Sequence, residues 1–192
     1  MSAPDPVLHS VVRAAVDVTA AGAGWVMGRT ADGARLQVVA AAGQIGGTID
    51  LSGLVGTEVA ADAGTAGFVL ASGQPLALSS AGADPRPAEG VAGLLGHRPA
   101  TVLCIACEVD DGVLGVIELV DKGGGGAFSF DDVELATVLA GIAAAALEAS
   151  GTTTAAVASP AALGANLQRL ADVDPARYGI VASVVTTLLE RD

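Results

Sequence analysis

Apolar residues gather in two short runs in the second half of the chain, at 101–109 and 113–120. Asp111 and Gly112 lie between the runs. A glycine at this place tolerates the positive φ angle that a tight hairpin turn needs. The pattern therefore predicts two strands joined by a tight turn.

The hydrophobic pattern changes to a helical period after four glycines at 123–126. Ser129 stands three residues before Asp132, a spacing typical of a capping box at a helix start. We expect a helix over 131–149, with one face buried. Its apolar residues recur at helical spacing, at Leu135, Val138, Leu139, Ile142 and Ala146.

Four weaker signals precede these elements. A helical pattern over 7–21 runs into an apolar segment at 23–27, and a turn at 32–33 leads into a second apolar segment at 36–40. The segment 64–76 reads as a further helix that ends in a glycine-containing turn. The order is thus helix, hairpin, helix, hairpin and helix.

Over residues 7–149 this order and its motifs resemble the GAF domain family, a small-molecule-sensing module related in shape to PAS domains. The segments that carry the resemblance include Gly64-Thr65-Ala66-Gly67-Phe68-Val69 and Asp84-Pro85-Arg86. The resemblance implies an α+β fold with a central antiparallel sheet of five to six strands and helices packed on it. It assigns residues 1–150 to the domain, as in a stand-alone bacterial GAF protein.

The character of the sequence changes beyond residue 150. Residues 151–159 are small and form a predicted linker. Two amphipathic patterns follow, and Asp174-Pro175 is typical of a helix start. We expect a C-terminal helical extension over 160–192, which is too short for a kinase, cyclase or DNA-binding output module.

The net charge narrows the range of partners. The chain carries a formal charge of -12 and has a pI near 4.3. Nucleic acids and anionic membranes require clustered Lys and Arg, so neither is an expected partner.

The apolar runs are shorter than the ~18 residues that a membrane helix requires. No signal peptide is recognisable, so we expect a cytoplasmic protein.

The two cysteines, Cys104 and Cys107, form a CxxC pattern that suggests redox or metal chemistry. Inside a strand, residues three apart point to opposite faces and their Cα atoms lie about 10 Å apart at ~3.3 Å per residue. That separation exceeds the ~7 Å limit for a disulfide. We therefore interpret both as small buried side chains. GAF-fold enzymes that reduce free methionine sulfoxide use a set of three cysteines, which this chain lacks.

His97 is a candidate heme ligand, because it precedes the strand that begins near Thr101. Heme-binding GAF domains carry a ligating His in nearly this place, and one imidazole is enough to hold the iron. The alternative is a histidine in a solvated loop.

The resemblance places the ligand cavity between the sheet and the segment 64–97, and the loop 79–96 is either a lid or a disordered loop. The candidate polar contacts to a ligand are Asp84, Arg86, His97, Arg98, Thr101 and Glu118.

The cyclic-nucleotide-binding branch of the family has an Asn-Lys, Phe and Asp-Glu signature. Lys122, Phe128 and Asp132 match it in order, whereas Asp121 and Val133 depart from it. The resemblance implies that Lys122 and Asp132 pair as a latch. The departures, the acidic composition and the absence of a phosphate-binding loop pattern argue against a cyclic nucleotide.

These observations favour a small-molecule-sensing regulatory domain with an unidentified ligand and no assigned cofactor. The resemblance implies a homodimer formed by the first and last helices, and the segment 160–192 is a candidate surface for a protein partner. The alternatives are a ligand-free interaction module and a heme sensor that uses His97. No nucleophile, base and orienting group converge in a motif, so we do not expect an enzyme.

Overall fold

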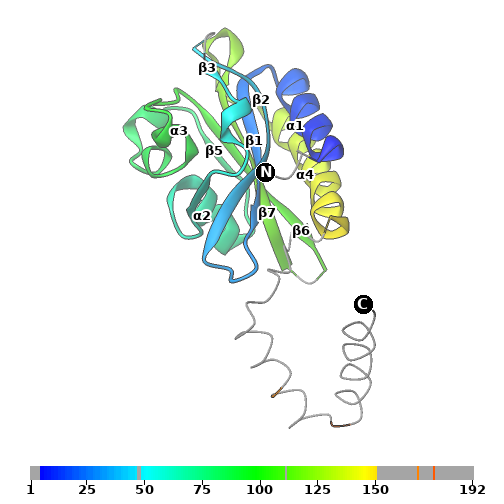
Figure 1. Cartoon of the computed structure of the whole chain (residues 1–192). Coiled ribbons are helices and arrows are strands. Elements are labelled where there is room, and N and C mark those ends of the chain that lie inside the picture. Colours follow the sequence, from blue (N-terminus) through cyan, green and yellow to red (C-terminus); the bar gives the residue numbers. More distant parts are fainter. Residues whose placement is uncertain (1–4, 47–48, 111, 151–167, 169–174, 176–192) are drawn as a thin grey trace. The chain divides into compact units, whose positions relative to one another are not determined.

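The computed structural model describes residues 5–46, 49–110 and 112–150, with the single residues Gln168 and Pro175. Apart from these two positions, the predicted linker and C-terminal helical extension lie outside the described residues. Within the described part, one antiparallel sheet carries helices on both faces (Figure 1).

The sheet follows the order β3-β2-β1-β7-β6-β5, and each neighbouring pair is antiparallel. A short additional strand, β4, pairs with β2. This path of six strands confirms the predicted antiparallel sheet. The strands are β1 (Ala21–Arg29), β2 (Arg35–Ile45), β3 (Ile49–Asp50), β4 (Glu58–Ala60), β5 (Leu76–Leu78), β6 (Val102–Val109) and β7 (Gly112–Lys122).

The predicted hairpin is the pair β6–β7, and Gly112 has the positive φ angle, 124°, that the sequence suggested for it. Glycine is also needed at the centre of the sheet, where β7 lies against β1. A Cβ atom on Gly115 would lie 2.1 Å from the carbonyl oxygen of Met27. Only a residue without a side chain allows these two strands to approach so closely.

One face of the sheet is covered by α1 (Pro6–Thr19) and α4 (Phe130–Ala149), which pack against each other (Figure 1). Asp5 caps α1 by accepting hydrogen bonds from the backbone N–H groups of Val7 and Leu8. The expected capping box of α4 is confirmed, because Ser129 and Asp132 each bond the other's backbone N–H. The two helices are thus fixed at their N-termini by local polar contacts.

The predicted buried face of α4 is wrong. Leu135, Val138 and Ile142 are 46%, 66% and 47% exposed. Small residues replace them at the contact with the sheet and with α1, because α4 approaches those elements too closely for larger side chains. The buried apolar residues are Ala136, Ala140, Ala143, Ala144 and Leu147. Leu139 and Ala146 lie at the edge and are half-buried.

The opposite face is covered by α2 (Gly64–Ser72), α3 (Val91–Leu94) and the connections around them (Figure 1). A second apolar core fills the space between, with Trp25 and Met27 of β1 completely buried in it. Within the described residues, three single turns of 3-10 helix lie in the connections before α3, namely η1 (Ser52–Leu54), η2 (Ala81–Ala83) and η3 (Arg86–Glu89), and a fourth, η4 (Gly123–Gly125), joins β7 to α4. None of the helices in the described ranges has the length and apolar character to cross a bilayer.

Candidate functional site

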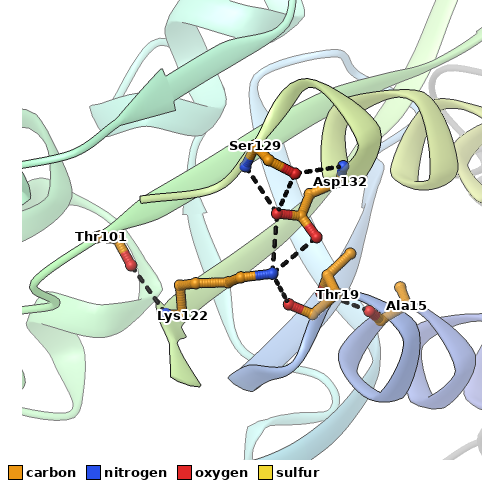
Figure 2. A network of polar contacts seen from close by, with 6 residues as sticks. All are labelled: Ala15, Thr19, Thr101, Lys122, Ser129 and Asp132. Carbon is orange, nitrogen blue, oxygen red and sulfur yellow. Dashed lines mark hydrogen bonds and ion pairs between the residues drawn. The ribbon is translucent and has the colours of Figure 1, made fainter. Parts of the chain in front are cut away.

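A polar network joins the end of β7 to both helices of the first face (Figure 2). The ammonium group of Lys122 donates to both carboxylate oxygens of Asp132, at 2.8 and 2.9 Å. It also donates to the backbone carbonyl of Thr19 at the end of α1, at 2.6 Å. One lysine therefore ties together the ends of α1 and β7 and the beginning of α4.

The Asp132 carboxylate is almost completely buried in this network. Besides Lys122, it accepts hydrogen bonds from the backbone N–H and the hydroxyl of Ser129, at 2.7 and 2.9 Å. Burial alone would raise the pKa of Asp132, but the hydrogen bonds from Lys122 and Ser129 outweigh it and hold the pKa below its ordinary value. Asp132 therefore stays ionised, as an ion pair requires.

Thr101 belongs to the same network (Figure 2). Its hydroxyl accepts a hydrogen bond of 2.8 Å from the backbone N–H of Lys122, and its side chain is buried. The sequence analysis placed Thr101 among the ligand contacts. In the structure this residue joins the start of β6 to the end of β7.

Asp121, next to Lys122, holds the segment before β6. It has a φ angle of 57°, in the left-handed region that Asn and Asp adopt more readily than other residues with side chains. One carboxylate oxygen accepts from the backbone N–H of Ala100 at 2.8 Å, and the other lies 2.5 Å from Nε2 of His97. The sequence analysis noted Asp121 only as a departure from a family signature. Its backbone conformation gave no signal in the sequence.

This contact bears on the heme alternative. Nε2 is the imidazole nitrogen farther from the backbone, and in this arrangement it faces a carboxylate. Iron ligation through Nε2 would require His97 to leave Asp121. The geometry therefore does not favour heme. As a separate finding, no group of three or more His, Cys, Asp or Glu side chains among the described residues is placed to hold a metal ion.

Glu118 lies in the middle of β7 on the face covered by α2, where it is 2% exposed. Its position relative to the sheet was left open by the sequence. One carboxyl oxygen accepts from Nε1 of Trp25 at 3.1 Å, and the other lies 2.6 Å from the hydroxyl of Thr65 in α2. Burial raises the pKa of Glu118, and the hydrogen bonds from Thr65 and Trp25 offset this effect only in part. The sequence analysis did not single out Trp25 or Thr65 as partners of this group.

Both cysteines are free and buried. Cys104 faces the core under α2 and Cys107 faces the core under α4, as expected for positions three apart in a strand. Burial raises the pKa of Cys107 to about 12 and raises that of Cys104 well above its ordinary value. Neither thiol is activated for redox chemistry or metal binding.

Asp84 and Arg86 form a local pair before α3, with 2.6 Å between Oδ2 and Nη2. Hydrogen bonds from Arg86 lower the pKa of Asp84 to about 2. The guanidinium of Arg86 also lies over the ring of Phe68 in α2, 5.3 Å from its centroid. Arg98, another predicted ligand contact, is exposed.

A depression of about 790 Å³ lies along α2, beside Gly64, Gly67 and Phe68 and next to the β1–β2 turn. Arg86 is the one predicted ligand contact that lines it, together with Arg29, Asp62, Phe68 and Glu89 among others. The predicted contacts thus do not converge on one cavity wall. Thr101 belongs to the network at the end of β7, and His97 contacts Asp121 beside it. Glu118 lies in a separate buried cluster, Asp84 and Arg86 form a local pair, and Arg98 is exposed.

The comparison with protein families agrees with this architecture. The model of the GAF domain matches residues 3–147, which is most of the chain. The chain belongs to the GAF domain family. GAF domains are sensory and regulatory modules, and the matched range contains every element described above except the last two residues of α4.

Solved structures, among them GAF domains, show the same fold at low sequence identity. The GAF-B domain of DevS from Mycobacterium smegmatis is 21% identical, with a TM-score of 0.58, over 78% of this chain and 96% of that one. The GAF domain of a phosphoenolpyruvate-protein phosphotransferase from Coxiella burnetii is 20% identical, with a TM-score of 0.63, over 79% and 89%. A free methionine-R-sulfoxide reductase from Neisseria meningitidis is 16% identical, with a TM-score of 0.56, over 80% and 84%. No curated protein matches the sequence.

Proposed function

We propose that this GAF domain is a regulatory sensor that binds a small molecule and acts as a homodimer in contact with a partner protein. Ligand binding would change the populations of two conformations for which the ligand has different affinities. The observation that carries the homodimer in this proposal is the exposed apolar surface of α4.

This outer α4 surface consists of Leu135, Val138 and Ile142. No charged residue occurs between Glu134 and Glu148, so this surface is uncharged along about two turns of the helix. Gly141 lies beside it, with no atom within 4 Å of the position of a Cβ atom, and leaves room for a close neighbour. On the adjacent helix, α1, Val7 and Val18 are 51% and 52% exposed.

A second copy of the chain is the occupant that suits this surface. Two copies that each carry a formal charge of -12 repel each other, so they associate most readily through surfaces without charge. A twofold dimer places the same patch of each subunit at the interface, and an uncharged patch meets itself without like-charge repulsion. Burial of exposed Leu, Val and Ile side chains supplies the driving force.

Sensing rather than catalysis is supported by the state of the reactive groups. The reductase from Neisseria meningitidis was solved in complex with its substrate, so a chain of this fold binds a small molecule. In the present chain both cysteines are buried with raised pKa values, which argues against thiol chemistry. We propose a binding function without catalysis, with Glu118, His97, Arg98, Thr101 and the Asp84–Arg86 pair as the contacts to test.

A ligand-free interaction module is the second candidate. It is favoured by the dense packing under α2, where Trp25, Met27 and Val69 are completely buried and Glu118 is nearly so. A GAF domain with this space filled would act through its surfaces alone. The outer α4 surface would then be its functional site.

Native mass spectrometry and sedimentation velocity of the full chain test both candidates. We expect a dimer for the wild-type protein and a monomer for Val138→Glu and Ile142→Glu, whose side chains are exposed enough for the subunit to stay folded. The matched control is Leu94→Glu, because Leu94 is 61% exposed but lies in α3. A wild-type monomer, or dimers of all three variants, would contradict the proposed interface. Added mass on the native dimer supports the sensor, whereas an unliganded dimer supports the interaction module.

A further inference from the structure

Glu118 is an ionisable group placed where a neutral side chain would be expected. It is 2% exposed, and its neighbours in the sheet are Trp25 of β1 and Cys104 of β6. A buried carboxylate is costly unless a cation pairs with it. In the part of the chain that the structure describes, no Lys, Arg or His forms an ion pair with Glu118.

The groups that face Glu118 are uncharged on every side. Trp25 offers the indole N–H, and α2 offers the hydroxyl of Thr65 and contains no titratable residue. Cys104 is the one titratable neighbour across the sheet, and burial keeps its thiol neutral by raising its pKa. Its own strand contributes Val116 and Val120 on this face.

The hydrogen-bond distances fit a protonated carboxyl group. In the ionised form, Glu118 accepts from both Nε1 of Trp25, 3.1 Å away, and the hydroxyl of Thr65, 2.6 Å away. A carboxylic acid still accepts from Trp25 through its carbonyl oxygen, and it donates its proton to Thr65 once that hydroxyl rotates from donor to acceptor. Thus the neutral form of Glu118 satisfies both contacts without a cation. The ionised form would need water or a positive charge in the core.

Water can reach Glu118 most easily if α2 moves. The buried residues of α2 are Gly64, Thr65, Ala66, Gly67 and Val69, so this helix contributes few large apolar side chains to the core. Its N-cap residue, Ala63, makes no side-chain capping bond. The depression of about 790 Å³ borders α2 beside Gly64, Gly67 and Phe68 and leaves space along that side of the helix.

We propose that Glu118 fastens α2 to the sheet only while it carries a proton, and that ionisation of Glu118 releases α2. The inference deepens the proposed sensing function, because α2 covers the sheet face on which the ligand site is expected. A ligand with a protonated amine would favour the same released state by pairing with the ionised carboxylate.

Protonation of Glu118 and packing of α2 are coupled, and this coupling determines the direction of the pH effect. Burial raises the pKa of Glu118 in the packed state, whereas in the released state the pKa returns toward its ordinary value of 4.5. The packed state is therefore favoured at low pH and loses this advantage as the pH rises. Between the two pKa values the opening equilibrium of α2 should rise about tenfold per pH unit, and it should level off above the higher one.

Hydrogen exchange of the full chain from about pH 5 to about pH 9 measures this opening, after each rate is corrected for the intrinsic pH dependence of exchange. We expect the protection of the α2 amides to fall with pH in the wild-type protein. In Glu118→Gln the fall should be absent, because glutamine keeps both hydrogen bonds and does not titrate. Fluorescence of Trp25, the single tryptophan, should shift to longer wavelength over the same range.

Two control variants separate titration from packing. Thr65→Val removes the hydroxyl but keeps Glu118. The protection of the α2 amides should therefore be lower at every pH, while its dependence on pH should stay the same. Glu108→Gln changes an exposed glutamate of β6 and should leave this pH dependence unchanged. The proposal is overturned if the protection of α2 in the wild-type protein does not change with pH, or if it falls equally in Glu118→Gln. It is also overturned if β1 and β7 lose protection in parallel with α2.

A direct measurement on the wild-type protein keeps the proposal testable if Glu118→Gln does not fold. The carboxyl carbon resonance of Glu118 should titrate above the ordinary value of 4.5 for a glutamate. Titration at the ordinary value would overturn the proposal. None of these measurements uses a ligand or depends on dimerisation, so their failure would leave the proposed sensor and dimer standing.

Discussion

The ion pair between Lys122 and Asp132 allows a stability prediction that can be worked from the structure. Replacing Asp132 with alanine removes both hydrogen bonds from the ammonium group and both from Ser129 (Figure 2). The side chains of Lys122 and Asp132 are 20% and 7% exposed, so the lysine would be left largely buried, with the carbonyl of Thr19 and the ring of Phe128, whose centroid lies 5.9 Å from Nζ, as its remaining contacts. The change therefore leaves the charge of Lys122 without its carboxylate partner, and it also removes one of the two bonds of the capping box.

Removal of one partner from a buried ion pair costs about 3–5 kcal/mol. The lower end of that range applies here, because Lys122 is partly exposed and keeps the contact to Thr19. Loss of the capping contacts adds about 1 kcal/mol. We expect Asp132→Ala to lower the free energy of unfolding by about 4 kcal/mol, a large share of the ~5–15 kcal/mol typical of a domain.

The assay is urea unfolding followed by the fluorescence of Trp25, at one fixed protein concentration. Asp132→Asn keeps the shape and an acceptor and should cost about half as much. Lys122→Met removes the ammonium but leaves the capping box, and the double variant Lys122→Met/Asp132→Asn gives the coupling energy. A loss below about 1 kcal/mol for Asp132→Ala, or a coupling energy near zero, would show that the pair is not a latch.

The pH dependence provides an independent check of the same pair. The pKa of Asp132 lies below its ordinary value of 3.8 in the folded protein. Its contribution to stability is therefore fully present above the unfolded pKa and is lost as the pH falls through the folded pKa. Asp132→Asn should flatten this acid part of the stability curve; an unchanged curve would contradict the assignment.

Two further predictions follow from buried positions. Gly115→Ala should destabilise the domain strongly, because its Cβ would meet the carbonyl of Met27 at 2.1 Å, whereas Gly126→Ala, with no atom within 4 Å, should be almost neutral in the same unfolding assay. Cys104 and Cys107 should not react with a thiol reagent until the protein is unfolded, since both are buried with raised pKa values; fast labelling of the native protein would show that the core opens readily.

Local patterns predicted the elements of the fold well. The hairpin glycine, Gly112, and the Ser129–Asp132 capping box act within a few residues of the chain, so their signals are present in short stretches of sequence. The choice of the buried face of α4 failed, because its residues are apolar around most of the helix. In that case the hydrophobic period cannot select a side, and the close approach to α1 and the sheet selected alanine.

The candidate site was less predictable, because its contacts join residues far apart in the chain. Glu118 bonds Trp25 and Thr65 from two other elements, and His97 meets Asp121 through a backbone conformation that the sequence does not reveal. One-residue changes in strand register decide which face a side chain occupies, and register is set by pairing across the whole sheet.

The sequence by itself determined the family, the order of helices and strands, and the positions of the caps and turns, since these depend on periodicity and on short-range backbone preferences. Tertiary structure alone decided that Glu118 is enclosed among neutral donors, that Thr101 joins the Lys122 network, and that Val138 and Ile142 remain exposed. These features depend on how closely distant elements approach one another. That distance is fixed by side-chain volume and strand register over the whole domain.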